Sequence, residues 1–326
     1  MDFTDVAGHQ SIINNLKSII IKNNISHSYL FEGPKSIGKS KVARVFAKTL
    51  LCEKQIEYSC NICSSCVKFD SGNHPDFYIN KTDGEALKKE HIEDIQKSVS
   101  ILPYEGKRKI FILEDIDKIT KQAQNSFLKT LEEPPKYVVI LMTVTNSNVL
   151  LPTIISRCQI LKFLPLEQGE IINLLINKYK KSRDEAAIIS SFSNGIVGKA
   201  VTIAKSREFQ DIREEIINII NEVINSDRAR IFTLKEFFNN QKDRIEDILD
   251  LMITWFRDVL ILKELNENQF IINADKKSLL SSHSLKLTKK KIYEIIKIIN
   301  STKMNIFSNV NYDLAIEVML LTIQEV

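Results

Sequence analysis

The stretch SYLFEGPKSIGKSKVARVFAKTL, residues 28–50, passes from a short apolar run through a glycine loop into a helical pattern. A strand followed by the pattern G-x-x-x-x-G-K-S and a helix is the context of a phosphate-binding loop, or P-loop. Gly33 and Gly38 let the backbone turn its N–H groups toward phosphates at a helix N-terminus, where the helix dipole favours anions. This stretch therefore predicts an α/β domain with a parallel sheet and a nucleotide site.

Two side chains of the loop have expected roles. Lys39 would reach the β- and γ-phosphates, and Ser40 would ligate Mg²⁺. We expect ATP or ADP to bind with Mg²⁺ through Gly33, Pro34, Lys35, Ser36, Ile37, Gly38, Lys39 and Ser40. Two alternatives stay open at this point: a glycine turn before a helix, or a loop that has kept its shape and lost its ligand.

The first half of the chain alternates strand and helix patterns around this loop. Besides the run at 28–33, strands are expected at 76–80, 109–114, 137–144 and 159–163, and helices at 39–51, 89–99 and 121–132. Such alternation gives a parallel sheet with helices on both faces. From about residue 167 only helical patterns follow: about three short helices, and then longer amphipathic ones at 208–225, 241–264, 288–301 and 310–324.

Composition and charge exclude several classes of protein. The chain has 326 residues, 44% hydrophobic and 26% charged, which is ordinary globular composition with length for two or three domains. A net charge of +4 is too small for a polybasic nucleic-acid binder, although a local basic face stays open. The N-terminal MDFTDVAGHQ has no basic segment before an apolar stretch, and apolar runs such as 137–142 are of strand length. We expect a soluble cytoplasmic protein that does not associate with membranes.

Four of the five cysteines form a second pattern, directly after the P-loop helix. Cys52, Cys60, Cys63 and Cys66 read C-x₇-C-x₂-C-x₂-C. Four thiolates this close suit a closed tetrahedral zinc site, and an insertion with almost no core of its own would need such a staple. We expect structural Zn²⁺. Disulfides, which the cytoplasm disfavours, and an iron–sulfur cluster are the alternatives. The fifth, Cys158, is expected to be a small packed residue.

An acidic pair follows the strand expected at 109–114. In FILEDIDK, residues 111–118, a hydrophobic run ends in Glu114 and Asp115. A P-loop ATPase uses acids at this point to hold Mg²⁺ and to polarise the attacking water. The alternative is a solvated strand end without a catalytic role.

Several motifs together resemble one family. HSYLFEGPKSIGKS (27–40), the four-cysteine insert, HPDFY (74–78), NSFLKTLEEPP (125–135) and LPTIISRC (151–158) look like those of the clamp-loader subunits of bacterial DNA polymerase III. The resemblance covers residues 1–165, and the helical remainder fits the lid and collar domains of that family. It implies an AAA+ P-loop domain at 1–165 with a zinc-binding insert at 52–66, an all-α lid at 166–206, and an all-α collar, the oligomerisation domain, at 207–326.

Two branches of this family share the motifs, a catalytic gamma/tau branch and a delta-prime branch. The gamma/tau branch has Asp then Glu at the acidic pair, whereas here Glu114 precedes Asp115. Withdrawing a general base by about 1 Å is expected to cost on the order of 10²-fold in rate. In GIVGKA (195–200), Gly198 stands where gamma/tau has an arginine that senses the γ-phosphate, and Lys199 would point about 100° away. The chain thus resembles the delta-prime branch, with weak or no hydrolysis of its own. A gamma/tau-type ATPase is the alternative.

The resemblance also implies partners and one catalytic residue. The family forms a hetero-oligomer of gamma/tau, delta and delta-prime subunits, which opens the sliding clamp and loads it on primed DNA. Arg157, in the SRC motif at the far edge of the sheet from the P-loop, is where the family places an arginine that acts in trans on a neighbouring subunit's ATP. Alternatively, Arg157 pairs with an acid across the subunit interface and only supports assembly. The basic cluster at 286–297 either faces DNA or another subunit, or is a solvated helix start.

Overall fold

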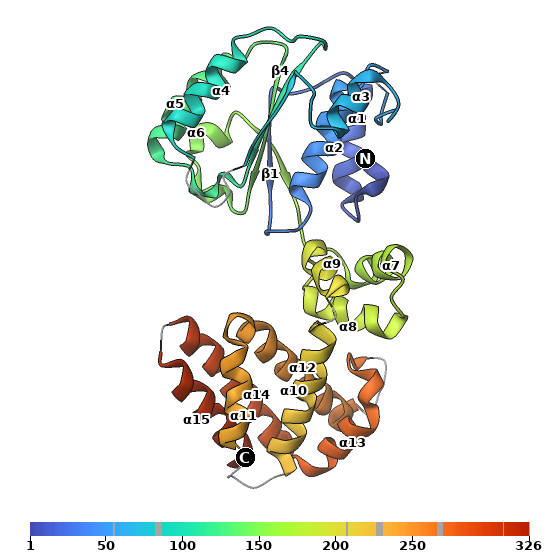
Figure 1. The fold of residues 1–326 in the computed structure, drawn as a ribbon, viewed down its shortest axis with the longest axis vertical. Coiled ribbons are helices and arrows are strands. Elements are labelled where there is room, and N and C mark those ends of the chain that lie inside the picture. The colour runs from blue at the N-terminus through green and yellow to red at the C-terminus, as the bar shows by residue number, and fades with distance from the viewer. Residues whose placement is uncertain are drawn as a thin grey trace. The chain divides into compact units, whose positions relative to one another are not determined.

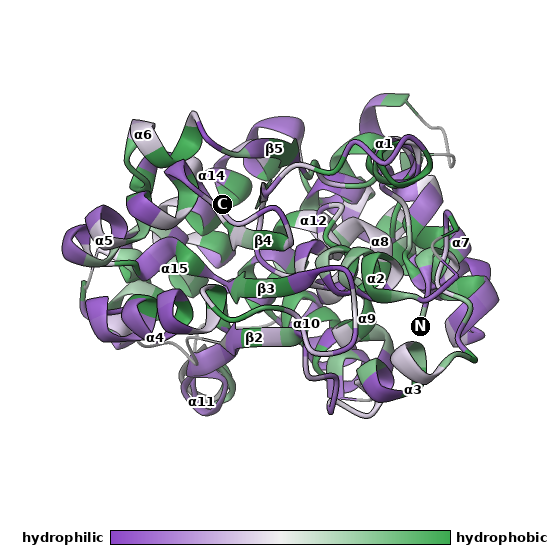
Figure 2. Cartoon of the chain, turned by 90° about the horizontal axis from the view of Figure 1, so that it is seen from above, coloured by the Kyte–Doolittle hydropathy of each residue, from purple (hydrophilic) through white to green (hydrophobic). Residues whose placement is uncertain are grey.

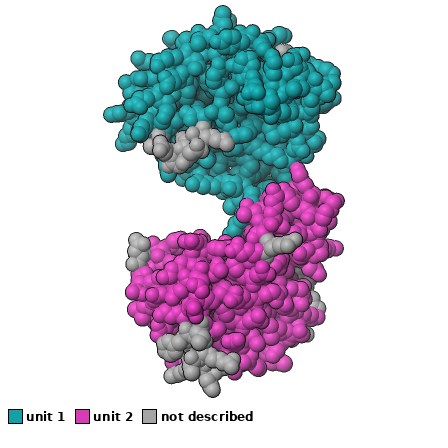
Figure 3. Space-filling view, in the orientation of Figure 1, with its two compact units in different colours: residues 1–171, 195–199 teal, residues 172–194, 200–326 magenta. Residues whose placement is uncertain are grey.

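The protein divides into two compact units in the computed structural model (Figure 3). Unit 1 comprises residues 1–171 and 195–199, and unit 2 comprises residues 172–194 and 200–326. The structure describes residues 1–54, 56–81, 87–206, 208–225, 231–265, 270–308 and 310–325. Each unit has a hydrophobic core of its own.

A parallel sheet forms the centre of unit 1. In the described residues it has five strands in the order β2-β3-β4-β1-β5, and every neighbouring pair is parallel. The strands are β1 Ser28–Glu32, β2 Phe77–Lys81, β3 Lys109–Glu114, β4 Val138–Val144 and β5 Gln159–Lys162. Because the strands run the same way, their carboxyl ends lie at one end of the sheet, and the P-loop follows β1 at that end.

Helices cover both faces of this sheet. Figure 1 shows α1 Gln10–Ile21 and α2 Lys39–Leu51 on one face, and α4 Lys89–Val99, α5 Lys121–Glu132 and α6 Pro152–Ile155 on the other. All residues of β3 and β4 are buried as a result, and β4 is an almost continuous apolar run (Figure 2). Two apolar clusters form, one on each face of the sheet.

Helix α2 is fixed along its length by the sheet. Val42, Val45 and Phe46 are fully buried, and Phe46 packs edge-on against Tyr29 of β1, with ring centroids 5.2 Å apart. The helix begins at Lys39, directly after the P-loop, and is followed at once by Cys52 in extended backbone. The P-loop and the first cysteine are therefore held at opposite ends of one helix.

Three short helices follow the sheet: α7 Gln168–Tyr179, α8 Arg183–Ser193 and α9 Val197–Lys205. The capping box expected at the start of α8 is present, since Ser182 Oγ accepts from Glu185 N at 3.2 Å and the Glu185 carboxylate accepts from Ser182 N at 3.0 Å. The start of α9 belongs to unit 1, where Gly198 N donates to Ser36 O of the P-loop.

Unit 2 continues with a bundle of helices (Figure 1). These are α10 Glu208–Asn225, α11 Ile231–Asn240, α12 Ile245–Leu265, α13 Lys277–Lys286, α14 Lys289–Phe307 and α15 Tyr312–Glu325. Helix α12 packs against α10, α13 and α14. Its Trp255 is buried and donates from Nε1 to Nδ1 of the buried His283 at 3.1 Å. Trp255 is thus a core residue of the bundle.

The fold class expected from the sequence is confirmed: a parallel α/β P-loop domain followed by helices. The apolar periodicity did not reveal the helices α1 Gln10–Ile21, α3 Ser64–Asp70, α11 and α13. Short 3₁₀ helices occur at Phe3–Asp5, Ile116–Lys118, Ser147–Val149, Lys242–Arg244 and Ala274–Lys276. The domain boundaries stay predictions, and residue 207 lies outside the described residues. Across the described part of the chain, no helix is both long and apolar enough to cross a membrane.

Candidate nucleotide site and metal centre

The P-loop joins β1 to α2 through backbone that favours glycine. Gly33 has a φ of +154°, and its N–H donates to Val144 O of β4 at 3.1 Å. A Cβ at Gly33 would lie 2.4 Å from Phe163 O, so a side chain has no room there. Gly38 has a φ of +119°, which strains any other residue. Both glycines that the motif fixes are therefore required by the geometry of the loop.

Lys39 points into its own loop. Its side chain is buried, and Nζ donates to Gly33 O at 2.6 Å and to Pro34 O at 2.9 Å. Burial lowers the pKa of Lys39, while the charges of Asp115 and Asp117 act in the opposite direction. A cavity of about 420 Å³ beside the loop is lined by Lys35, Ser36, Gly38, Lys39, Ser40, Lys41, Asp115 and Gly198. A phosphate bound here would have to draw Nζ away from the two carbonyls.

Two residues outside the motif contact the P-loop backbone. Gly198 N donates to Ser36 O at 2.8 Å, and a Cβ on Gly198 would lie 2.6 Å from both Cβ and O of Ser36. His9 Nε2 lies 3.0 Å from Ile37 O and must be the donor, because a carbonyl oxygen only accepts. Burial lowers the pKa of His9. Two successive carbonyls of the loop are therefore held by the chain itself.

The acidic pair after β3 is split between two environments. Glu114 is buried, and its Oε1 lies 3.2 Å from Nε of Arg44 on α2. Asp115 is exposed at a φ of +52°, donates from its N–H to Thr143 Oγ1 at 2.9 Å, and lines the P-loop cavity. The alternative of a solvated strand end therefore fails for Glu114. Of the two carboxylates, Asp115 lines the cavity beside Lys39.

The four-cysteine insert brings all four sulfurs together. Cys52 directly follows α2, Cys63 caps α3, and Cys66 lies within α3. The four Sγ atoms lie within 4.8 Å of one another. Backbone N–H groups point at these sulfurs: those of Cys60, Cys63 and Cys66 lie 3.4, 3.3 and 3.4 Å from the Sγ atoms of Cys52, Cys60 and Cys63. The four cysteines that the sequence pattern predicts to bind one metal ion therefore lie together in the structure.

The chemistry of these donors fits zinc. The Ile62 N–H is the main reason that the pKa of Cys60 falls to about 6, whereas burial raises the pKa of Cys52 and of Cys66. A thiol must lose its proton to bind a metal, so binding here releases protons. Four thiolates without another donor type suit the tetrahedral coordination that Zn²⁺ takes in structural sites.

Arg157 follows α6 and stands beside β5. Its backbone is fixed, because Ser28 Oγ donates to Arg157 O at 2.6 Å and Arg157 N donates to Ile154 O at 3.1 Å. Its side chain is 33% exposed and donates to Thr153 O and to the Glu132 carboxylate, both at 2.8 Å. One expectation is corrected: β5 neighbours β1, so Arg157 is not at the far edge of the sheet from the P-loop. It lies instead at the opposite end of the strands.

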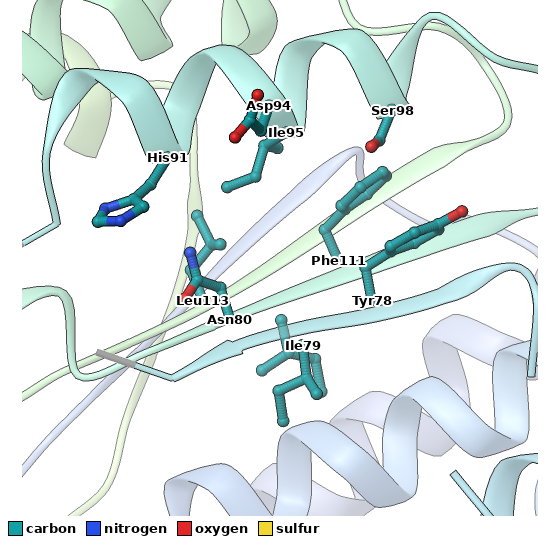
Figure 4. A pocket seen from close by; sticks show the side chains of 10 residues that line it. Tyr78, Ile79, Asn80, His91, Asp94, Ile95, Ser98, Phe111 and Leu113 are labelled. Atoms are coloured by element: carbon teal, nitrogen blue, oxygen red, sulfur yellow. The ribbon is translucent and has the colours of Figure 1, made fainter. Parts of the chain in front are cut away.

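A separate cavity of about 250 Å³ lies between β2, β3 and α4 (Figure 4). Tyr78 and Phe111 stack on its strand side with ring centroids 5.0 Å apart, and His91, Asp94 and Ser98 line it from α4. It contains none of the residues predicted to bind nucleotide or metal, and we assign it no role.

The fold and the site define the class of protein. A P-loop between β1 and α2 of a five-stranded parallel sheet, with a following helix placed on the loop through Gly198, is the arrangement of an AAA+ P-loop module. Residues 8–167 match the family model for the DNA polymerase III delta subunit, and residues 207–325 match that for the C terminal part of the DNA polymerase III delta subunit.

Comparison with individual relatives shows to which family of DNA polymerase III subunits the chain belongs. The chain is 32% identical to DNA polymerase III subunit delta' of Bacillus subtilis over 318 residues, which cover 96% of this chain and 95% of that relative. It is 28% identical to DNA polymerase III subunit tau of the same organism over 285 residues, which cover 80% of this chain and 50% of tau. The chain belongs to the DNA polymerase III delta' family of clamp-loader subunits.

Solved structures give a weaker comparison. A DNA polymerase III gamma subunit-related protein from Thermotoga maritima aligns over 96% of this chain and 98% of its own, with 18% identity and a TM-score of 0.47. That score is too low to carry an argument.

Some contacts of the site were not predicted from the sequence. The sequence does not indicate the contacts of His9 and Lys48, or the partners of Glu114 and Arg157. The segment DVAGHQ, residues 5–10, lies far upstream of the P-loop, and a lone histidine carries no signal of its own. Lys48 had a weak signal, since a lysine at the apolar end of α2, four residues before Cys52, is a rare choice for a buried position.

Proposed function

We propose that this chain is the delta-prime wall subunit of a DNA polymerase III clamp loader. In that role it assembles with gamma/tau and delta subunits into a hetero-oligomer, and the complex opens the sliding clamp and loads it on primed DNA. The family match, which extends along nearly the whole chain, supports this role. The chain would work as part of the polymerase holoenzyme rather than as an efficient ATPase alone.

The observation that carries the proposal is the setting of Arg157. The backbone is anchored to β1, while the guanidinium is partly exposed and uses two of its donors on Thr153 and Glu132. Arginine has five N–H donors, so others remain for a phosphate. The Glu132 side chain is 47% exposed, and such ion pairs contribute only about 0–1 kcal/mol, so the pair can open. Arg157 would then act in trans on a neighbouring ATP, where such arginines contribute roughly 10³–10⁵ in rate.

Three features support weak or absent hydrolysis at the chain's own P-loop. Glu114 is paired with Arg44, Asp115 is the shorter acid, and Gly198 supplies no cation to a γ-phosphate. An arginine at 198 would also collide with Ser36 unless the loop moved. The site therefore has a pocket for nucleotide but lacks groups that an efficient ATPase uses.

Two cofactors belong to this proposal. One structural Zn²⁺ would be bound by Cys52, Cys60, Cys63 and Cys66. It would hold the insert against α2 and take no part in a reaction. The loop from Gly33 to Ser40 would hold ATP or ADP with Mg²⁺, with Lys39 on the phosphates and Ser40 on the metal. Iron in place of zinc remains the alternative for the first site.

Exposed apolar side chains on unit 2 support assembly into a larger complex. Met304 and Phe307 near the end of α14 are 65% and 61% exposed, and Leu314 and Val318 lie one turn apart on α15 with 57% and 45% exposure. The two side chains of each helix lie on the same face of that helix, and large exposed apolar surface marks interaction sites. We take these four side chains as part of the contact with other subunits.

An ATPase measurement separates this proposal from a gamma/tau-type motor. The isolated chain should show steady-state hydrolysis near background, and adding it to gamma/tau and delta subunits should restore ATP hydrolysis and clamp loading that the mixture without it lacks. Intrinsic turnover that Lys39→Ala abolishes would instead identify an autonomous ATPase.

A further inference from the structure

Lys48, on the last turn of α2, is a buried lysine outside every predicted site. Its side chain has no exposed surface. Lysine is almost never fully buried unless its charge is paired, because an ammonium loses its hydration on burial. The partners of Lys48 therefore indicate what this position is for.

Those partners lie in the cysteine insert and on α3, the helix that carries its last cysteine. Nζ donates to Asn61 Oδ1 at 2.5 Å and to Asp70 Oδ2 at 2.6 Å. Asn61 lies in the turn between Cys60 and Cys63, at a φ of +58°, and Asp70 is the last residue of α3. One ammonium thus joins three parts of the metal centre: the helix before it, the turn that carries two of its ligands, and the helix that carries the fourth.

The charge of Lys48 also suits a centre made of thiolates. Zn²⁺ with four thiolates carries two net negative charges, and Cys52 and Cys66 are buried. Burial works against the ammonium, but the Asp70 carboxylate and the Cys66 sulfur favour it, so that the pKa of Lys48 lies above its ordinary value. A cation that interacts with the Cys66 sulfur offsets part of the thiolate charge.

We propose that Lys48 is a positioning residue of the metal centre. It holds the Asn61 turn and α3 against α2 so that the four sulfurs stay within bonding range of one ion, and its charge stabilises the thiolate form. The proposal rests on the zinc site proposed above. Residues that orient metal ligands typically contribute about 10- to 100-fold to metal affinity.

The experiment measures zinc affinity of the full chain by competition with a chromogenic chelator. Lys48→Met keeps the length of the side chain and removes its charge and donors, and we expect zinc to bind about 10- to 100-fold more weakly. Lys68→Met is the matched control, because Lys68 also lies close to the cluster, on α3, but pairs with exposed Glu105. It should leave the affinity unchanged.

A second variant covers the case in which Lys48→Met does not fold. Asn61→Gly tolerates the positive φ and removes the side chain that Lys48 holds, together with the contacts of that side chain to Met1, Asp2 and Ser59. We expect faster zinc release to EDTA with the melting of the sheet domain unchanged. Cobalt-loaded variants that fold should keep the absorption of a tetrahedral four-sulfur site, because Lys48 is not a ligand. Wild-type affinity and release rate in Asn61→Gly, or wild-type affinity in a folded Lys48→Met, would overturn the proposal. A wild-type chain that binds no zinc would instead overturn the zinc site itself.

Discussion

Helix α2 has a candidate site at each end. The two sites differ in how closely their residues are already arranged as ligand binding requires. At the C-terminal end, four sulfurs lie within 4.8 Å of one another, and backbone N–H groups already point at these sulfurs. At the N-terminal end, Lys39 donates to carbonyls of its own loop, and Gly198 contacts Ser36. Metal binding needs the loss of protons and a small approach of the sulfurs to one ion, whereas nucleotide binding must exchange internal contacts for contacts with phosphate.

An intact sequence motif and a preorganised binding site are therefore separate properties. Both motifs are intact in the sequence. Binding is strongest where the free protein already has the bound arrangement, because little ordering or breaking of contacts opposes it. We therefore expect tight metal binding and weaker nucleotide binding on the same helix.

The largest expected effect is at the cysteine end. Cys63→Ser removes one of four ligands, and bound zinc should fall from about one per chain to near zero, since the affinity depends on the complete set. Elemental analysis measures the metal, and limited proteolysis should show new cleavage within 52–70 while the sheet and α2 stay protected. Cys158→Ser, whose sulfur lies outside the cluster, should keep the zinc. Equal zinc in both variants would contradict the assignment.

The second largest expected effect is a loss of nucleotide affinity at the P-loop. Lys39→Ala removes the cation expected on the phosphates, and a hydrogen bond to a charged group is worth about 1.5–3 kcal/mol, so ADP·Mg²⁺ affinity should drop roughly 10- to 100-fold. Calorimetry at millimolar nucleotide measures this. If the wild-type chain binds no nucleotide, the loop has kept its shape and lost its ligand. Only the cysteine end of α2 would then be a binding site.

A smaller effect concerns the contact between α9 and the loop. Gly198→Ala places a methyl group 2.6 Å from Ser36, and overpacking of this kind costs about 1–3 kcal/mol of unfolding free energy. Gly169→Ala is the matched control, because a Cβ there meets nothing within 4 Å. Chemical denaturation should show a loss for Gly198→Ala alone. Equal unfolding free energies of the two variants would mean that the close contact between Gly198 and Ser36 is not important for stability.

The smallest effect is a pH dependence at His9. Burial holds the pKa of His9 below its ordinary value of 6.5, although the Ile37 carbonyl and Glu170 act in the opposite direction. The unfolded chain therefore binds this proton more readily, so its contribution to stability is complete above pH 6.5 and declines as pH falls. His9→Gln keeps a donor for Ile37 O and does not titrate. Its melting temperature should fall less between pH 7 and pH 5 than that of the wild type. Parallel curves would rule His9 out as the cause.

The parts that the sequence predicted well depend on short-range patterns. The central strands β1, β3 and β4 are buried and nearly continuous apolar runs, and the edge strands β2 and β5 are short runs with apolar residues, so all five were recognisable. The P-loop and the cysteine spacing are each contained in fewer than about twenty residues. The Ser182–Glu185 capping box is equally local. Each of these features is specified by residues that are close together in the chain.

The unpredicted parts depend on contacts between distant segments. The sequence showed glycine at 198 but not that Ser36 O would pack against it. It showed the order of Glu114 and Asp115 but not that Arg44 would bind the first and leave the second at the cavity. It placed Arg157 after a short helix but could not give its partner Glu132. Such pairings follow from the packing of helices on the sheet, and no single-sequence pattern encodes them.

We propose that this chain acts through Arg157 on a neighbouring subunit's ATP. The most direct test is the ATP hydrolysis rate of the reconstituted complex carrying Arg157→Ala, with Arg183→Ala, an exposed arginine on α8, as the matched control. Because a trans-acting arginine contributes roughly 10³–10⁵ at its site, the account predicts normal assembly and zinc content but a large loss of hydrolysis at the adjoining site and slow clamp loading. Lysine at 157 should rescue poorly, because it lacks the planar fork of donors. An Arg157→Ala complex that assembles, hydrolyses ATP and loads clamps like the Arg183→Ala complex would contradict the account.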